Sequence, residues 1–186
     1  QLYLYPIVPL PKSSEAYYPV TDAYIVSDGK RTYYQGLEMK DADPLQLYAL
    51  EEIKENGTRR KSIWYTTDDQ RVYFKNKKLS VQSSKSLYTF EIEGLSQQPY
   101  LYVPTAGSVW IKDMRFPSEN EPYTMVSPHG GHINQVLFLS PDGVYFYDSE
   151  KETIKRAGNN PFHNRSFKEI APLVFYNGKQ ILYLES

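Results

Sequence analysis

Short apolar runs rich in aromatic residues alternate along the chain with turns rich in Asp, Asn and Gly. The pattern is clearest over residues 66–79, where Val72-Tyr73-Phe74 follows one polar turn and precedes another. β-Branched and aromatic residues favour strands, and Asp-Gly or Asn-Gly between two such runs favours a tight hairpin turn. We therefore predict hairpins throughout the chain, with helix in less than about a fifth of the residues, against the usual third.

The hairpin pattern recurs at a nearly constant interval. Similar stretches occupy residues 27–39, 100–111 and 136–147, and aligned aromatic residues lie 40, 37 and 35 positions apart. A period of this length is typical of meanders with three or four short strands per unit. The predicted fold is mainly β, with about four hairpin or meander units in a single domain over residues 23–186. The expected strands cover residues 23–26, 31–34, 62–65, 72–74, 87–92, 100–103, 108–111, 136–139, 144–147, 173–176 and 180–183.

Three segments depart from the repeat. Four prolines in residues 1–22 predict a Pro-rich N-terminal arm, extended or forming an edge strand, because proline lacks the backbone donor of a central strand. Residues 45–53 fit either two helical turns or a turn and a strand. We favour the strand because Asn56-Gly57 suits a hairpin that follows it. Residues 112–134 contain several prolines and glycines and predict a structured excursion in a long loop, where function often resides.

Strand alternation separates two sets of side chains in each copy. One set is mostly aliphatic and predicts the core: Val72, Phe74, Val109, Ile111, Val144 and Phe146. The opposite set contributes one large ring per copy, which makes these the candidate binding residues: Tyr33, Tyr73, Trp110 and Tyr145. The rings either line an exposed stripe that binds a partner or pack beneath loops as a second core layer. We favour the second arrangement because exposed aromatic patches are uncommon on monomers.

Composition excludes several classes of protein. A net charge of −1 argues against a protein that binds a phosphate backbone, so no nucleic-acid partner is predicted. The chain has no cysteine, which excludes disulfides, thiolate metal sites and cysteine nucleophiles. No apolar run approaches the ~20 residues of a transmembrane helix. Because the sequence begins at Gln1 without a methionine, we expect that a leader has been removed, such as a secretory signal or a lipoprotein leader with its lipid anchor.

Catalytic signals are weak. His129 and His132 flank two glycines and could share a metal, but His163 is the only other histidine and no carboxylate is close in sequence. Serines lack the Gly-x-Ser-x-Gly context of a nucleophile elbow, and no glycine-rich phosphate loop is present. The carboxylate pair Asp68-Asp69 lies in a predicted turn, where solvation is the simpler expectation. The sequence therefore predicts a non-enzymatic protein with no cofactor and no bound metal.

The repeat unit resembles that of the DKNYY repeat proteins. The motifs that carry the resemblance are Tyr33-Tyr34-Gln35-Gly36 with Ala42-Asp43-Pro44, and the run from Asp69 to Leu79, within residues 23–90. Residues 175–181 repeat the closing half only. The family is mostly bacterial, often exported or lipid-anchored, and has no established activity. The resemblance implies a periplasmic or outer-envelope location, and some such proteins lie beside toxins, which makes an immunity role conceivable.

These observations leave three functional hypotheses. The leading one is a non-enzymatic bacterial envelope protein that binds another protein, such as a toxin that it neutralises. The second is a carbohydrate- or peptidoglycan-binding module, for which tyrosine and tryptophan platforms would also serve. The third is a metal-dependent hydrolase built around His129 and His132.

Overall fold

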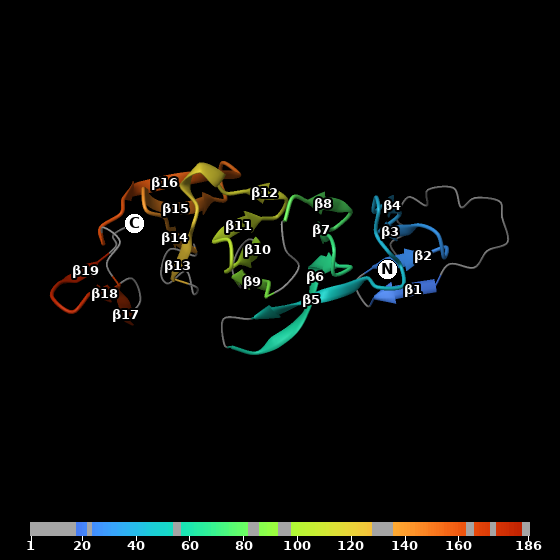
Figure 1. The fold of residues 1–186 in the computed structure, drawn as a ribbon, viewed down its shortest axis with the longest axis horizontal. Helices are drawn as coiled ribbons and strands as arrows, with labels where there is room; N and C mark the ends of the chain where they lie inside the picture. The colour runs from blue at the N-terminus through green and yellow to red at the C-terminus, as the bar shows by residue number, and fades with distance from the viewer. Residues whose placement is uncertain are drawn as a thin grey trace. The chain divides into compact units, whose positions relative to one another are not determined.

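A computed structural model describes residues 18–21, 24–53, 57–81, 86–92, 98–127, 136–162, 166–171 and 174–183. The protein is mainly β, built from antiparallel sheets, as predicted (Figure 1). Across these ranges the only helical element is one turn of 3₁₀ helix, η1 (Ser118–Asn120), so the expectation of little helix is confirmed there. None of the described residues form a helix that is long and apolar enough to cross a membrane.

The internal contacts of the chain divide it into two compact units, and the single domain expected over residues 23–186 stays a prediction. One unit contains residues 1–52 and 59–89, and the other contains residues 53–58 and 90–186. Each unit has apolar clusters of its own. The cluster of Ile25, Tyr34 and Tyr73 belongs to the first unit, whereas that of Val109 and Phe138 belongs to the second.

The first unit contains two runs of neighbouring strands. One sheet has the order β1-β2-β3-β4, and the second run has the order β5-β6-β7-β8. The strands are β1 (Tyr18–Thr21), β2 (Ile25–Ser27), β3 (Thr32–Tyr34), β4 (Leu37–Glu38), β5 (Tyr48–Ile53), β6 (Arg59–Thr67), β7 (Val72–Phe74) and β8 (Lys77–Leu79). The strand over residues 48–53 confirms the turn-and-strand interpretation of residues 45–53. The edge position of β1 fits the expected arm or edge strand, although residues 1–17 lie outside the described residues.

The second unit contains three such runs. Their orders are β12-β11-β10-β9, β13-β14-β15-β16 and β17-β18-β19. The strands are β9 (Tyr88–Ile92), β10 (Gln98–Val103), β11 (Ser108–Ile111), β12 (Met114–Arg115), β13 (Thr124–Ser127), β14 (Leu137–Leu139), β15 (Gly143–Asp148), β16 (Thr153–Asn159), β17 (Lys168–Ala171), β18 (Val174–Tyr176) and β19 (Ile181–Tyr183). Every strand expected from the sequence has a counterpart. The strands that the sequence pattern missed are β4, β8, β12, β13, β16 and β17.

The turn between β6 and β7 shows how the repeat sequence makes a hairpin. The Asp68 carboxylate accepts hydrogen bonds from the backbone N–H groups of Gln70 at 3.1 Å and Arg71 at 2.7 Å. The Thr67 hydroxyl donates to the Arg71 carbonyl at 2.8 Å. Such side chains favour turns because they satisfy the backbone locally. Ser27, Asp28 and Arg31 form the same bonds between β2 and β3.

Five hairpins share this turn length, with four residues between the paired strand ends. The flanking pairs, which define copies 1 to 5, are Ser27 with Thr32, Thr67 with Val72, Val103 with Ser108, Leu139 with Val144, and Tyr176 with Ile181. Each hairpin has two faces. The side chains of the flanking pair point to one face, which we call the flank face. The side chains of the neighbouring pair, one residue further from the turn on each strand, point to the opposite face, which we call the ring face.

This register corrects the sequence alignment at the third copy. The ring-face residues equivalent to Tyr73 are Tyr33, Val109, Tyr145 and Leu182. Trp110 pairs with Leu101 and therefore lies on the flank face, one residue away from the position that we predicted. A one-residue slip reverses the face of every side chain in a strand. The error arose because the alignment matched large rings instead of the turn residues.

The predicted loop excursion at residues 112–134 is largely ordered structure. Strand β12, η1 and β13 occupy residues 114–127, and the rings of Phe116 and Tyr123 are buried. The Tyr123 hydroxyl donates to the Pro117 carbonyl at 2.9 Å, and its backbone N–H donates to the Gly107 carbonyl at 2.7 Å. The expected excursion is thus structured over residues 112–127, where it contains the strands β12 and β13 that the sequence pattern did not predict. Residues 128–134 lie outside the described residues.

Candidate functional site

Tyr73 is a core residue. Its side chain is 0% exposed and packs with Ile25 and Tyr34, and its hydroxyl donates to the Lys40 carbonyl at 3.0 Å. Burial raises the pKa of the Tyr73 hydroxyl above its usual range. The ring therefore offers no surface to a partner.

Trp110 and Tyr145 are also buried, at 2% and 5% exposure. Arg115 lies over the Trp110 ring at 5.1 Å, and Tyr145 donates its hydroxyl hydrogen to Asp142 at 2.8 Å. Burial, followed by this bond to the Asp142 carboxylate, raises the pKa of the Tyr145 hydroxyl. Neither ring lies on an exposed binding surface.

Tyr33 is the one candidate ring that is only half-buried. Its hydroxyl donates to Asp28 at 3.4 Å, and the Arg31 guanidinium lies 5.9 Å from the ring centre. Tyr33 and Tyr73 belong to the first unit, whereas Trp110 and Tyr145 belong to the second. The four residues thus form no exposed aromatic stripe within either unit.

The six predicted core residues fall into separate clusters. Five of them are buried and Phe146 is half-buried. Val109 and Ile111 pack with Tyr145, whereas Val144 packs with Leu137. The separation follows from the register correction, because Val109 and Ile111 lie on the ring face of their copy.

The flank faces of copies 1 to 4 are covered almost completely. All but one of their paired residues are at most 7% exposed, and Phe146 is half-buried. The set comprises Ile25, Ser27, Thr32 and Tyr34; Tyr65, Thr67, Val72 and Phe74; Leu101, Val103, Ser108 and Trp110; and Leu137, Leu139, Val144 and Phe146.

For two of these flank faces, the side chains that cover them belong to the same unit. In the first unit, Tyr73 from the ring face of copy 2 joins the cluster of Ile25 and Tyr34 from copy 1. In the second unit, Phe175 from the ring face of copy 5 joins the cluster of Leu137 and Val144 from copy 4. In both cases the ring face of one hairpin covers the flank face of another.

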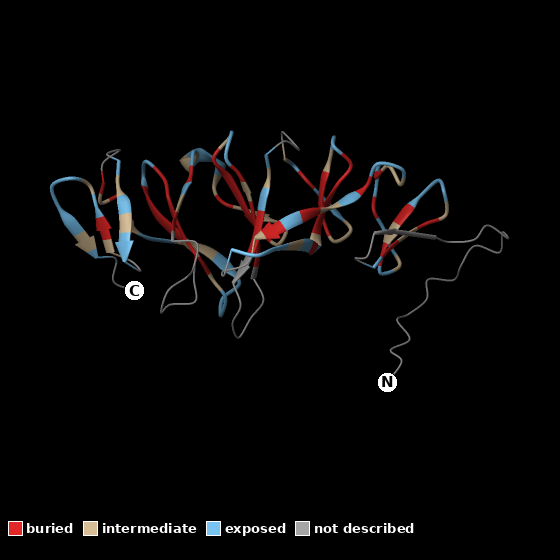
Figure 2. Ribbon diagram, turned by 90° about the horizontal axis from the view of Figure 1, so that it is seen from below, coloured by how far each residue is buried: buried red, intermediate tan, exposed pale blue. Residues whose placement is uncertain are grey.

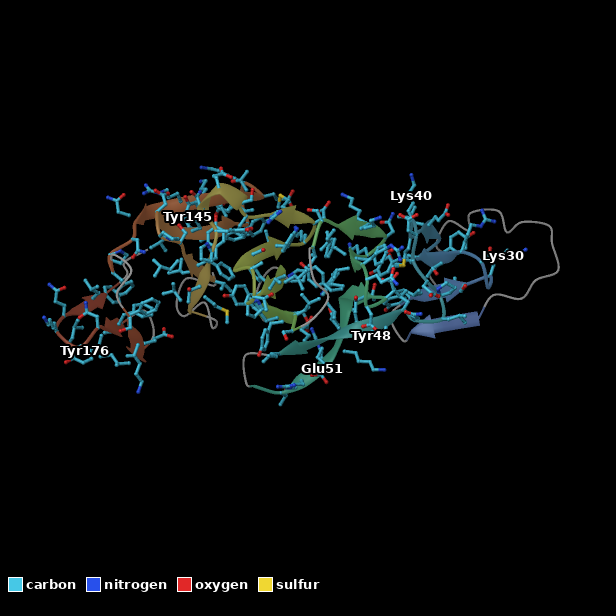
Figure 3. All side chains as sticks on the ribbon, viewed as in Figure 1. Lys30, Lys40, Tyr48, Glu51, Tyr145 and Tyr176 are labelled. Carbon is cyan, nitrogen blue, oxygen red and sulfur yellow. The ribbon has the colours of Figure 1, made fainter. Side chains whose placement is uncertain are left out.

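The flank face of copy 5 differs from all the others. Tyr176 is 42% exposed, Ile181 is 67% exposed and Tyr183 is 64% exposed, and Val174 is half-buried (Figure 2, near the C-terminus). These four residues, which we call the C-terminal face, share one side of the sheet because Tyr176 pairs with Ile181 and Val174 with Tyr183. Figure 3 labels Tyr176 on this sheet. The opposite side buries Phe175 at 0% exposure.

Sequence reasoning did not identify the C-terminal face. The alternation of Tyr176, Ile181 and Tyr183 is the same as in the buried hairpins, so the pattern alone predicts a covered surface. The exposed apolar face of β18 and β19 is a surface that another molecule can cover.

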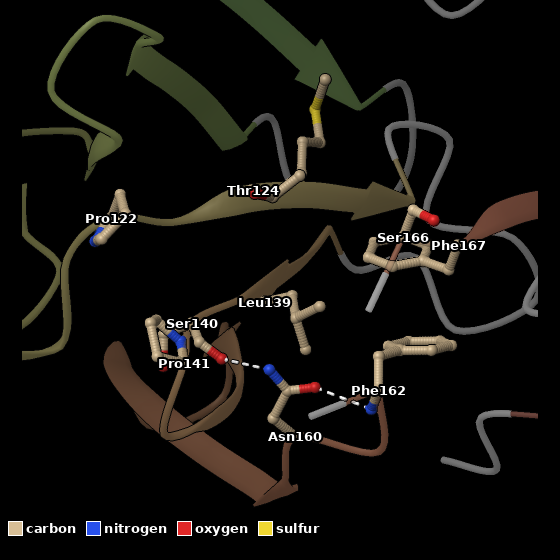
Figure 4. Close-up of a pocket in the computed structure, with 10 residues that line it drawn as sticks. Pro122, Thr124, Leu139, Ser140, Pro141, Asn160, Phe162, Ser166 and Phe167 are labelled. Carbon is tan, nitrogen blue, oxygen red and sulfur yellow. Dashed lines mark hydrogen bonds between the residues drawn. The ribbon is translucent and has the colours of Figure 1, made fainter. Parts of the chain in front are cut away.

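A pocket of about 660 Å³ also opens in the second unit, beside the contact between the flank face of copy 4 and the ring face of copy 5 (Figure 4). Asn160 donates to the Ser140 carbonyl at 2.8 Å and accepts from the backbone N–H of Phe162 at 2.8 Å. None of the lining residues is charged: they are Pro122, Thr124, Met125, Leu139, Ser140, Pro141, Asn160, Phe162, Ser166 and Phe167. This lining suits a neutral ligand.

Within the described ranges, no group of three or more His, Asp or Glu side chains is arranged to hold a metal ion. His129, His132 and His163 lie outside these ranges, so the histidine hypothesis falls on residues that the structure does not describe.

Comparisons with known proteins give no match. No protein-family model matches the chain, and neither a curated protein nor a solved structure does. The case for a function therefore depends on the surfaces of the molecule itself.

Proposed function

We propose that this chain is a non-enzymatic binding protein that docks another protein on its C-terminal face. The observation that carries the proposal is the contrast between equivalent residues. Ile181 is 67% exposed, whereas its counterparts in copies 1 to 4 are at most 4% exposed. Tyr183 shows the same contrast with Tyr34, Phe74 and Trp110.

The chemistry of the C-terminal face fits protein recognition. Tyrosine is enriched at the centres of protein interfaces, where it supplies a large apolar ring and a polar hydroxyl. A contiguous exposed apolar patch on a monomer commonly marks an interaction site. The backbone pairs β18 with β17 and β19, so the face is presented on a three-stranded antiparallel sheet.

The resemblance to DKNYY repeat proteins extends the proposal to location and role. It supports a bacterial envelope location, and within that setting neutralising a toxin is one role that a protein-docking surface could serve. The docking face itself does not depend on the resemblance.

The proposal is tested with the full chain immobilised in three forms. These are the unmodified protein, the double variant Ile181→Ser with Tyr183→Ser, and the control Leu45→Ser, which alters an exposed leucine elsewhere. We expect a partner from the source organism to bind the unmodified and control forms and to lose at least tenfold in affinity for the double variant. Equal binding to all three forms would overturn the proposal.

The uncharged pocket favours a second candidate, the binding of a neutral carbohydrate. The half-buried ring of Phe167 suits the apolar side of a sugar ring, and the exposed Thr124 hydroxyl supplies a polar group for sugar hydroxyls. Calorimetric titration with neutral oligosaccharides should give binding that Phe167→Ala abolishes. No binding at millimolar sugar, or binding that Phe167→Ala leaves unchanged, would exclude this pocket as the site.

A further inference from the structure

We propose that the partner of the C-terminal face is a second copy of this chain, which docks through the ring face of its copy 1. The inference rests on the proposed function of the C-terminal face and names its partner. The contact joins two different surfaces, so copies associate head to tail.

The proposed contact repeats an arrangement already present within the molecule. The flank face of copy 1 is covered by Tyr73 from a ring face, and the flank face of copy 4 is covered by Phe175 from a ring face. Sheets that pack face to face interdigitate the side chains of their inner surfaces. The occupant that repeats this arrangement on copy 5 is therefore another ring face.

Among the five ring faces, that of copy 1 is the most accessible. The ring faces of copies 2 to 4 are buried at Tyr73, Val109 and Tyr145, and that of copy 5 is buried at Phe175. The ring face of copy 1 is different. Its paired residues Val26 and Tyr33 are only half-buried, and the neighbouring Tyr24 is 57% exposed.

Charge complementarity supports the pairing of these two faces. On the C-terminal sheet, the exposed Lys168 lies directly opposite Tyr176 in the strand pairing. On the ring face of copy 1, the exposed Glu38 lies directly opposite Tyr33. Arg31, which lies over the Tyr33 ring, forms an ion pair with Asp28, and Glu38 adds a negative charge opposite in sign to that of Lys168. Complementary charges set orientation and suppress wrong pairings.

The geometry has a defined consequence for assembly. A head-to-tail contact leaves one free face at each end, so association continues beyond the dimer unless the ring closes. The exposed parts of the four C-terminal residues cover on the order of 400 Å², about half of the roughly 800 Å² per partner in a stable interface. We therefore expect reversible, concentration-dependent association instead of a permanent oligomer.

Sedimentation velocity of the full chain over a concentration series tests the inference, with two variants that each disable one face. The tail variant, which disables the C-terminal face, carries Ile181→Glu and Tyr183→Ser. The head variant, which disables the ring face of copy 1, carries Glu38→Lys and Tyr24→Asn. Asparagine is chosen at position 24 because it tolerates the positive φ of 58° there. Circular dichroism and thermal unfolding check that both remain folded.

The unmodified chain should show a sedimentation coefficient that rises with concentration, and each variant alone should stay monomeric. A 1:1 mixture of the two variants should form a dimer and nothing larger. The tail variant keeps an intact ring face of copy 1 and the head variant keeps an intact C-terminal face, so only one contact can form. Association should also return in a single chain that combines Glu38→Lys with Lys168→Glu.

Three results would overturn the inference. They are a monomeric unmodified chain at the highest concentration, a head variant that still dimerises through two C-terminal faces, and a variant mixture that stays monomeric. If the chain is monomeric while the C-terminal double variant still loses its captured partner, the inference fails and the proposed function stands. If the double variant keeps that partner as well, both fail.

Discussion

Truncating Tyr73 should destabilise the first unit far more than truncating its repeat equivalent, Tyr33. Tyr73 is 0% exposed and packs in an apolar cluster, whereas Tyr33 is half-buried. Replacing a buried aromatic side chain by alanine costs about 3–5 kcal/mol, from lost transfer free energy and from the cavity that remains. We expect about 4 kcal/mol for Tyr73→Ala and about 1 kcal/mol for Tyr33→Ala.

The Tyr73→Phe variant separates the ring from its hydroxyl. This change removes the 3.0 Å hydrogen bond to the Lys40 carbonyl and keeps the packing. A neutral hydrogen bond contributes about 1 kcal/mol net to stability. Tyr73→Ala should therefore destabilise the protein far more than Tyr73→Phe does. Tyr33→Ala and Tyr73→Phe should cost similar amounts.

Tryptophan fluorescence during urea unfolding measures these differences in the correct unit. Trp64 belongs to the first unit and Trp110 to the second, so a Trp110→Phe background leaves Trp64 as the only reporter. A loss of about 4 kcal/mol is a large fraction of the stability of a small unit and should shift the urea midpoint strongly downward. Equal midpoint shifts for Tyr73→Ala and Tyr33→Ala would refute the burial contrast between the two copies.

Two further predictions concern turns. Burial raises the pKa of Asp68, but backbone N–H donors from Arg71 and Asp43 and the Arg71 guanidinium outweigh it, so the folded pKa lies below its usual value. Asp68 therefore stabilises the fold above about pH 4 and loses this effect as pH falls through the folded pKa. Asp68→Asn should lower the free energy of unfolding by about 2 kcal/mol at pH 7. The stability of this variant should also fall less steeply with pH below pH 4 than that of the unmodified protein. Urea midpoints that fall equally steeply in the variant and the unmodified protein would contradict this prediction. Gly107→Ala should destabilise the second unit by more than about 2 kcal/mol, since the new Cβ would collide with Pro122 at a φ of 61°. Gly178→Ala, at a φ of 90° with open space around it, is the control for backbone strain alone, and equal losses in thermal unfolding would refute the steric argument.

The strands were predictable because the turn residues specify them locally. Asp68 and Asp28 bond the backbone of their own turns, so the information for each hairpin lies within a few residues. The strand register of the third copy was harder to predict from the sequence. Its turn, residues 104–107, lacks the Asp of the first two copies, and the large ring of Trp110 then misled the alignment.

Exposure could not be predicted from the same pattern. Tyr183 and Phe74 occupy equivalent positions in their hairpins, yet one is 64% exposed and the other 7% exposed. The difference lies in whether another sheet covers the face, which is a property of tertiary packing. The burial of the candidate rings Tyr73 and Tyr145 agrees with the second core layer that we favoured for them.

The order of strands in three of the sheets bears on how the chain folds. In β1–β4, β13–β16 and β17–β19, every strand pairs with its immediate neighbour in sequence. Contacts between residues close in sequence require little loop-closure entropy, and proteins rich in them fold faster than sandwiches with distant strand pairs. Each of these meanders can therefore form as a local cooperative unit before the sheets pack together. We expect hydrogen exchange to protect the strands of each meander as a group, with the C-terminal sheet, which has one face uncovered, opening first.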